Sequence, residues 1–255
     1  GNNSAGSING GSSFHNVTFN AAPGTISASS NGTSFHKVIF NGDGTLNNNG
    51  IYDSLIFAAG HTYSLGYNAT QTINNALKAD GTCSQPIVIQ SSYTGYQATI
   101  SQSTGTVTIS YVRLKDMNAT GGAVFTANNT TNFGNNTGWT INSPSTQNLY
   151  WIGGTGNWND ASHWSTVSGG SAGTCIPTRY DNVIFDAGSF SGNAQTVTIN
   201  VPAYCKSMDW SGITSSSIQM SGTSDLHISG SLAMKSTMII TGYTGTLYFE
   251  STGTG

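Results

Sequence analysis

The chain has 255 residues, of which only 7% are charged, and its formal net charge is −3. Ordinary proteins carry about 25% charged residues, so Ser, Thr, Asn and Gly must fill most solvent-facing positions here. Seven Lys and Arg residues scattered along the chain cannot form the basic stripe that follows a nucleic-acid backbone, and we expect no nucleic-acid partner. No apolar run approaches the ~18 residues of a membrane-spanning helix, so we expect this segment not to be inserted in a membrane.

The first part of the chain repeats itself in short alternating runs bounded by Gly, Asn and Ser, a pattern that predicts β-strands. One series reads FHNVTF at residues 14–19, FHKVIF at 35–40 and YDSLIF at 52–57. A second series keeps step with it, reading GTI at 24–26, GTL at 44–46 and HTYSL at 61–65. A repeat of about 20 residues with apolar positions in register is what a parallel β-helix requires, because one coil buries its apolar face only against its neighbours.

The apolar positions of the first series predict which side chains stack inside the coils. Alternate residues of a strand share a face. We therefore predict three interior ladders: Phe14/Phe35/Tyr52, Val17/Val38/Leu55 and Phe19/Phe40/Phe57. The most helix-like stretch, residues 72–78, is too short to be stable as a helix alone. We predict an all-β fold of parallel β-helix-like coils in two consecutive modules. β-Sandwich repeats are the alternative, but they do not require equivalent residues at coil-length intervals.

Further along, the repeat loosens between residues 86 and 114 and fades at 130–139. A Trp-rich segment follows at 150–164, and the coil pattern resumes with QTVTI at 195–199. The run CKSMDW at 205–210 has the same apolar spacing as residues 14–19. We therefore interpret residues 1–147 as the C-terminal part of one β-repeat unit. Residues 148–255 are then the Trp-rich junction and the N-terminal part of the next unit.

The Trp-rich segment carries a resemblance to a known family. It reads WIGGTGNWNDASHW at 151–164, and CIPT at 175–178 and DNVIFD at 181–186 follow a Gly/Ser stretch. This order resembles a segment that recurs in the giant repetitive surface adhesins of gliding Bacteroidetes, the SprB-type adhesins. Residues 203–210 and 123–139 are similar to the same family. The Trp segment also resembles, more weakly, one found in autotransporter passenger domains, which are β-helices.

The resemblance implies an internal fragment of a long, secreted adhesin filament used in gliding motility and surface attachment. It implies export by the type IX secretion system, display at the bacterial cell surface on the outer membrane, and movement by the gliding motor. The implied partners are components of that system and motor, together with surface polysaccharide or the substratum. The alternatives are a glycan-binding or glycan-cleaving β-helix protein and a purely structural stalk or spacer.

We predict that the chain is not an enzyme and holds no cofactor. Enzymes on β-helices need clustered carboxylates or a basic residue beside bound calcium. The ten acidic residues form no paired signature, and the nearest pairing within a motif is Asp181 with Asp186. Isolated Ca²⁺ binding by Asp181, Asp186 or the Asp43 turn remains open beside plain turn capping.

The tryptophans and cysteines of the second part suggest structural roles. Trp151, Trp158 and Trp164 would close the end of a coil stack, or alternatively form an aromatic platform for carbohydrate. Cys175 and Cys205 flank a β segment and are predicted to form a disulfide, which an exported chain permits. Cys83 is then left over, buried or paired elsewhere.

Two surface positions of the first part complete the candidates. His15 and His36 occupy equivalent repeat positions, which favours an outward stack of imidazoles over a metal ladder, since the third repeat carries Asp53 there. Residues 53–55, DSL, resemble the Bacteroidetes O-glycosylation pattern, in which Asp is followed by Ser or Thr and an apolar residue. Ser54 is therefore a predicted O-glycosylation site.

Overall fold

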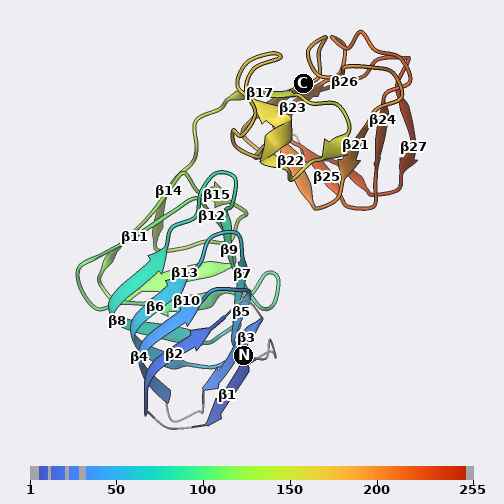
Figure 1. Cartoon of the computed structure of the whole chain (residues 1–255). Helices are drawn as coiled ribbons and strands as arrows, with labels where there is room; N and C mark the ends of the chain where they lie inside the picture. The colour runs from blue at the N-terminus through green and yellow to red at the C-terminus, as the bar shows by residue number, and fades with distance from the viewer. Residues whose placement is uncertain (1–5, 11–12, 21–22, 29–32, 251–255) are drawn as a thin grey trace. The chain divides into compact units, whose positions relative to one another are not determined.

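The chain forms two compact units, Gly1–Pro144 and Ser145–Gly255. The computed structural model describes residues 6–10, 13–20, 23–28 and 33–250. Each unit is a parallel β-solenoid, in which strands pair with equivalent strands one coil later (Figure 1). The predicted all-β, coil-repeat fold is confirmed, and the sandwich alternative is wrong because a sandwich is built from antiparallel sheets. The division between the units falls just before the boundary expected at 147/148.

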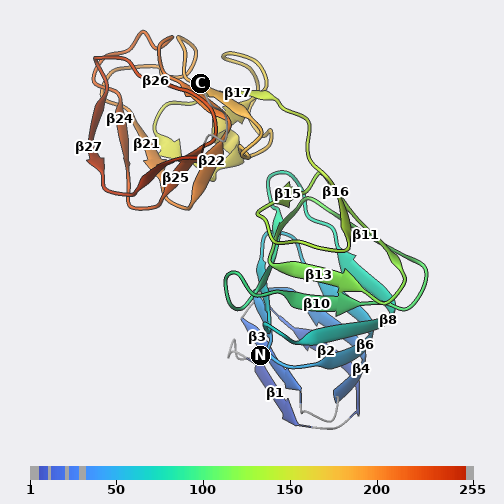
Figure 2. The same cartoon turned by 180° about the vertical axis from the view of Figure 1, so that it is seen from behind.

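The first unit has three faces, and each face is a sheet of parallel strands that lie side by side in Figures 1 and 2. One face contains β1 (Gly6–Gly10), β3 (Gly24–Ala28), β5 (Gly44–Leu46), β7 (Thr62–Leu65), β9 (Ile87–Ser91), β12 (Val112–Lys115) and β15 (Thr131–Asn132). The second contains β2 (Ser13–Phe19), β4 (Thr33–Phe40), β6 (Gly50–Phe57), β8 (Thr70–Ala79), β10 (Ala98–Ser101) and β13 (Met117–Thr120). The third contains β11 (Thr106–Ser110), β14 (Val124–Asn128) and β16 (Trp139–Asn142).

The three predicted interior ladders are confirmed by the strand register. Phe14, Val17 and Phe19 pair with Phe35, Val38 and Phe40, which pair in turn with Tyr52, Leu55 and Phe57. The stacked rings of Phe14 and Phe35 are 5.3 Å apart, and those of Phe35 and Tyr52 are 5.2 Å apart. Like side chains therefore fill the interior at the spacing of neighbouring strands, about 4.8 Å.

The apolar spacing of these runs also explains how the coil bends. Phe35 and Val38 are both buried, and two outward residues, His36 and Lys37, lie between them where a flat strand would have one. The same spacing in the second unit accompanies a sharper bend of the chain. Cys205 and Met208 are both buried, but there the chain turns at Lys206 and the two residues belong to different sheets. The extra outward residue thus marks a corner of the coil in the second unit, whereas in the first unit it lies within the continuous strand β4.

The second unit also has three faces. Its first face contains β17 (Asn148–Trp151), β20 (Asn182–Ile184), β23 (Ser207–Asp209) and β26 (Leu232–Ala233), with β19 (Trp164–Ser165) antiparallel on the edge of β17. The second contains β18 (Gly156–Asn157), β21 (Thr196–Ile199), β24 (Gln219–Gly222) and β27 (Ile239–Tyr243). The third contains β22 (Ala203–Cys205), β25 (Leu226–Ile228) and β28 (Leu247–Phe249).

Helical structure in the described part of the chain is limited to one short 3-10 turn, η1 (Ala161–His163), which Asp160 caps through a hydrogen bond from Ser162 N. Residues 72–78, the most helix-like stretch of the sequence, lie within strand β8. Over the described residues, no helix has the length and apolar character needed to cross a membrane.

Candidate functional site

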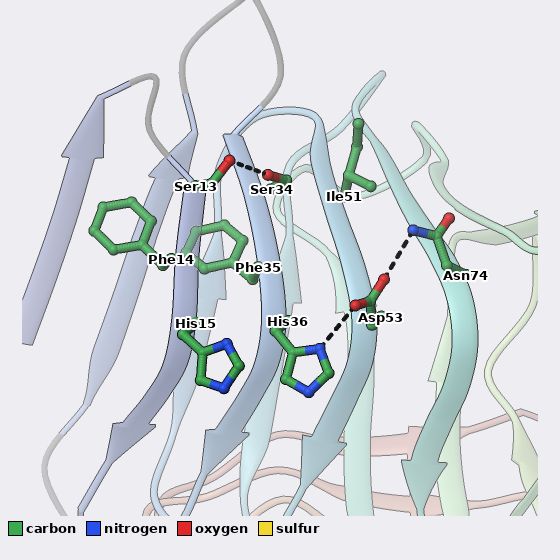
Figure 3. Close-up of a pocket in the computed structure, with 9 residues that line it drawn as sticks. All are labelled: Ser13, Phe14, His15, Ser34, Phe35, His36, Ile51, Asp53 and Asn74. Atoms are coloured by element: carbon green, nitrogen blue, oxygen red, sulfur yellow. Dashed lines mark hydrogen bonds and ion pairs between the residues drawn. The ribbon is translucent and has the colours of Figure 1, made fainter.

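A groove of about 390 Å³ lies on the outside of the first unit, over strands β2, β4, β6 and β8 (Figure 3). It is lined by Ser13, Phe14, His15, Ser34, Phe35, His36, Ile51, Asp53 and Asn74. Equivalent positions on four neighbouring strands supply most of these residues, so the groove is a product of coil stacking.

A row of polar side chains crosses this groove from strand to strand (Figure 3). The rings of His15 and His36 stack with centroids 4.7 Å apart and 11° between their planes. His36 Nδ1 lies 2.8 Å from Asp53 Oδ2, and Asn74 Nδ2 donates to Asp53 Oδ1 at 3.1 Å. The predicted outward imidazole stack is therefore confirmed. The hydrogen bond from His36, followed by that from Asn74, lowers the pKa of the Asp53 carboxyl.

The chemistry of this row is hydrogen bonding at an exposed surface. A carboxylate on one ring nitrogen orients the imidazole and favours the tautomer that leaves the other nitrogen as an acceptor. The hydroxyls of Ser13 and Ser34 bond to each other at 2.8 Å. The row can therefore offer donors and acceptors to a polar ligand.

The carboxylates considered for calcium hold turns together. Asp181 accepts hydrogen bonds from Thr178 N at 2.8 Å, Thr178 Oγ1 at 2.7 Å and Gln147 N at 3.1 Å. Asp186 accepts from Gly188 N at 2.8 Å, and Asp43 accepts from Thr62 N at 2.9 Å. The described residues contain no group of three or more His, Cys, Asp or Glu side chains that could hold a metal ion. Asp181 and Asp186 therefore cap turns, whereas Asp43 joins two successive coils. Calcium binding by these residues stays a prediction.

Trp151, Trp158 and Trp164, called here the tryptophan cap, are fully buried at the start of the second unit. The ring of Trp164 packs edge-on against those of Trp151 and Trp158, at centroid distances of 5.1 and 4.9 Å. Two indole N–H groups donate to backbone carbonyls, Trp151 to Gly154 at 2.7 Å and Trp164 to Trp158 at 2.8 Å. The alternative of an aromatic carbohydrate platform is wrong for these residues, because their faces are covered by protein.

The predicted disulfide between Cys175 and Cys205 is wrong. Cys205 is a free, buried cysteine. Cys205 ends β22 on the interior face, where it pairs in register with the buried Ile228. It therefore fills a ladder position as a small apolar side chain. Burial, and then the charge of Asp181, raises the pKa of its thiol to about 12.

Ser54, the predicted O-glycosylation site, is half-buried on strand β6. Its register neighbours are Lys37 on β4 and Ala76 on β8. The modification remains a prediction.

Three exposed tyrosines form a cluster that the sequence analysis did not single out. Tyr67, Tyr93 and Tyr96 expose 52%, 58% and 56% of their surface. Their ring centroids are 5.6 Å (Tyr67–Tyr93), 6.3 Å (Tyr67–Tyr96) and 5.3 Å (Tyr93–Tyr96) apart. A partial signal was present, since two of them lie in the turn-like sequence SSYTGYQ at 91–97. Their meeting with Tyr67 depends on the register between successive coils.

Parallel coils and interior ladders define the class of both units, the parallel β-solenoid. Comparisons of the chain with protein-family models, with curated proteins and with solved structures found no match.

Proposed function

We propose that this chain is a non-catalytic segment of an extracellular adhesin filament of the gliding-motility type, displayed at a bacterial surface. The observation that carries the proposal is a set of uncharged side-chain rows running from coil to coil along the outer surface. Asn41 donates to Asn20 at 3.0 Å, and Asn47 donates to Ser27 at 3.0 Å. In the second unit, Ser207 donates to Asn182 at 2.7 Å, which donates to Asn148 at 2.9 Å.

Such a surface suits attachment through many weak contacts. Hydroxyl and amide rows offer hydrogen bonds at regular intervals, while the scarcity of charge limits nonspecific electrostatic binding. Weak contacts repeated along a chain multiply into strong attachment without one tight pocket. The Trp-rich motif at 151–164 and its resemblance to gliding adhesins support type IX secretion and the gliding motor as partners, and polysaccharide or the substratum as the attachment target.

A structural spacer is the second candidate, and the interior ladders favour it. A stack held together by aromatic and aliphatic ladders is a stable rod segment whether or not its surface binds anything. Deleting these two units from a parent adhesin while keeping its ends separates the two roles. We expect attachment of cells to fall with the deletion, whereas unchanged attachment at shortened reach would favour the spacer.

The isolated chain allows a direct test of adhesion. Beads coated with the chain should attach to a polysaccharide-coated surface against flow, and the attachment should rise steeply with coating density because it depends on multiple contacts. Beads coated with serum albumin are the control. Equal detachment of both bead types would contradict the adhesive role, and release of sugars from neutral polysaccharides by the chain would contradict the non-catalytic one.

A further inference from the structure

The tyrosine cluster, defined as Tyr67, Tyr93 and Tyr96, lies at one corner of the first unit. Tyr67 follows β7, and Tyr93 and Tyr96 lie in the longer turn that follows β9, the next strand of the same sheet. Asn68 N donates to Gln97 O at 3.0 Å, which places the two turns in direct backbone contact. The three rings therefore come together from two successive coils.

The backbone under these rings is held in place. Gly95 N donates to Asp116 Oδ2 at 3.1 Å, and Asn135 Nδ2 donates to Asp116 Oδ1 at 2.7 Å. Gln97 Nε2 donates to Asn135 O at 2.9 Å. The turn carrying Tyr93 and Tyr96 is thus pinned by the corners of the two coils that follow. A ligand would meet a preformed surface and pay little for ordering it.

A second set of contacts fixes Tyr67 against the same turn. Tyr67 N donates to Ser92 Oγ at 3.0 Å. Asn68, beside it, has a positive φ of 57°, a conformation that Asn adopts more readily than most residues. These contacts hold the three rings at the surface, although burial of their apolar faces would be energetically favourable.

The chemistry of the cluster selects its ligand. Each tyrosine has an apolar ring face and a hydroxyl at the tip, a combination that suits a ligand with both apolar and polar surface. A pyranose ring has this character, with C–H groups on its faces and hydroxyls around its edge. The carboxylate of Asp116 is 3% exposed and both of its oxygens accept hydrogen bonds from the protein. It is therefore not available as a counter-charge for a cationic ligand.

We infer that Tyr67, Tyr93 and Tyr96 form a binding platform for neutral carbohydrate, with sugar rings packed on the exposed tyrosine faces. The inference names the ligand class and the residues for the attachment proposed above, and it rests on that proposal. The carbohydrate platform considered as an alternative role for the tryptophans of the second unit is thereby replaced by one on different aromatic residues in the first unit.

The test uses the whole chain and a panel of neutral hexasaccharides of glucose, galactose, mannose and xylose. Binding is measured by calorimetry and by shifts of the tyrosine ring signals in NMR. We expect at least one hexasaccharide to bind, with affinity reduced about tenfold in Tyr93→Ala and in Tyr96→Ala, a loss that corresponds to about 1.4 kcal/mol for the missing ring contact. Tyr93→Phe, which keeps the ring, should retain most of the affinity.

The matched control is Tyr248→Ala, which removes a tyrosine that is 42% exposed in the second unit. It should leave the affinity unchanged. Thermal unfolding of each variant checks that the fold persists. The inference is overturned if no neutral hexasaccharide binds, if Tyr93→Ala and Tyr96→Ala bind as well as the parent chain, or if only tetramethylammonium or a proline-rich peptide shifts the tyrosine signals. Beads that still attach in any of these cases would leave the adhesive function standing.

Discussion

The indole ring of Trp210 lies face to face with the phenyl ring of Phe185, with centroids 3.4 Å apart and 4° between the planes. Phe185 follows β20 and Trp210 follows β23, so the pair joins two successive coils of the second unit. Both side chains are fully buried, and the indole N–H of Trp210 has no hydrogen-bond partner. Trp210 therefore stabilises the second unit through ring packing and not through a hydrogen bond of its indole N–H.

Trp210→Ala and Trp210→Phe should therefore differ sharply. The alanine variant should lower the free energy of unfolding of the second unit by about 3–5 kcal/mol. The phenylalanine variant keeps a ring against Phe185 and removes an unpaired buried donor, so it should cost about 1.5 kcal/mol at most. Urea unfolding followed by the fluorescence of Trp151, Trp158 and Trp164 measures both, and equal losses would contradict the ladder role.

Strand β6 offers a matched pair for the interior ladders of the first unit. Leu55 is fully buried between Val38 and Leu77, whereas Ile51 on the same strand is 39% exposed. Leu55→Ala should lower the stability of the first unit by about 2–5 kcal/mol. Ile51→Ala should cost much less, because its side chain leaves a smaller void. Scanning calorimetry, which resolves separate transitions for separately unfolding units, is the measurement. Similar losses for the two variants would contradict the inward register.

The hydrogen bonds to Asp53 predict an acid-sensitive contribution to stability. Since His36 and then Asn74 lower the carboxyl pKa below its ordinary 3.8, the ionised form stabilises the fold above that pH. The contribution is lost as the pH falls through the lowered folded-state pKa. A carboxyl NMR titration should give Asp53 a pKa below 3.8 in the parent chain and a higher one in His36→Ala. His15→Ala, which leaves the His36–Asp53 hydrogen bond in place, is the control.

Cys205 should be unreactive in the folded chain. Its thiol is buried and its pKa is raised to about 12, so little thiolate exists at pH 8. Iodoacetamide at pH 8 should leave the peptide containing Cys205 unlabelled until urea unfolds the second unit, and mass spectrometry reports the labelling. Detection of a Cys175–Cys205 disulfide in the native protein would instead restore the original pairing.

Much of the fold is readable from the repeat. In parallel coils a side chain meets its own equivalent in the next turn, so recurrence of Phe, Val and Phe along the sequence translates directly into the ladders at Phe35, Val38 and Phe40. The outward stack of His15 on His36 followed from the same logic. Equivalence of position was enough, and no knowledge of long-range geometry was needed.

The sequence predictions failed at positions that have no equivalent in the neighbouring repeats. The interior position of Cys205 depends on the corner at Lys206, which sends residues on either side of it into different sheets. The exposed tyrosines lie in corner turns of unlike length, at positions with no counterpart in the repeat. Residues that recur in the sequence identify the side chains that stack in successive coils. The conformation and length of each corner turn depend instead on how its own coil closes.

The antiparallel strand β19 covers the outer edge of β17, the first coil strand of the second unit. The stack of coils therefore has a defined beginning. Strand β19 covers its edge, and the tryptophan cap packs three aromatic rings there from residues that are close together in the sequence. Later coils need only the coil before them, so we expect the second unit to assemble progressively from its capped end, in the order in which its residues leave a ribosome or a narrow pore. We expect each turn to form on the turn before it, because each coil contacts only its neighbours.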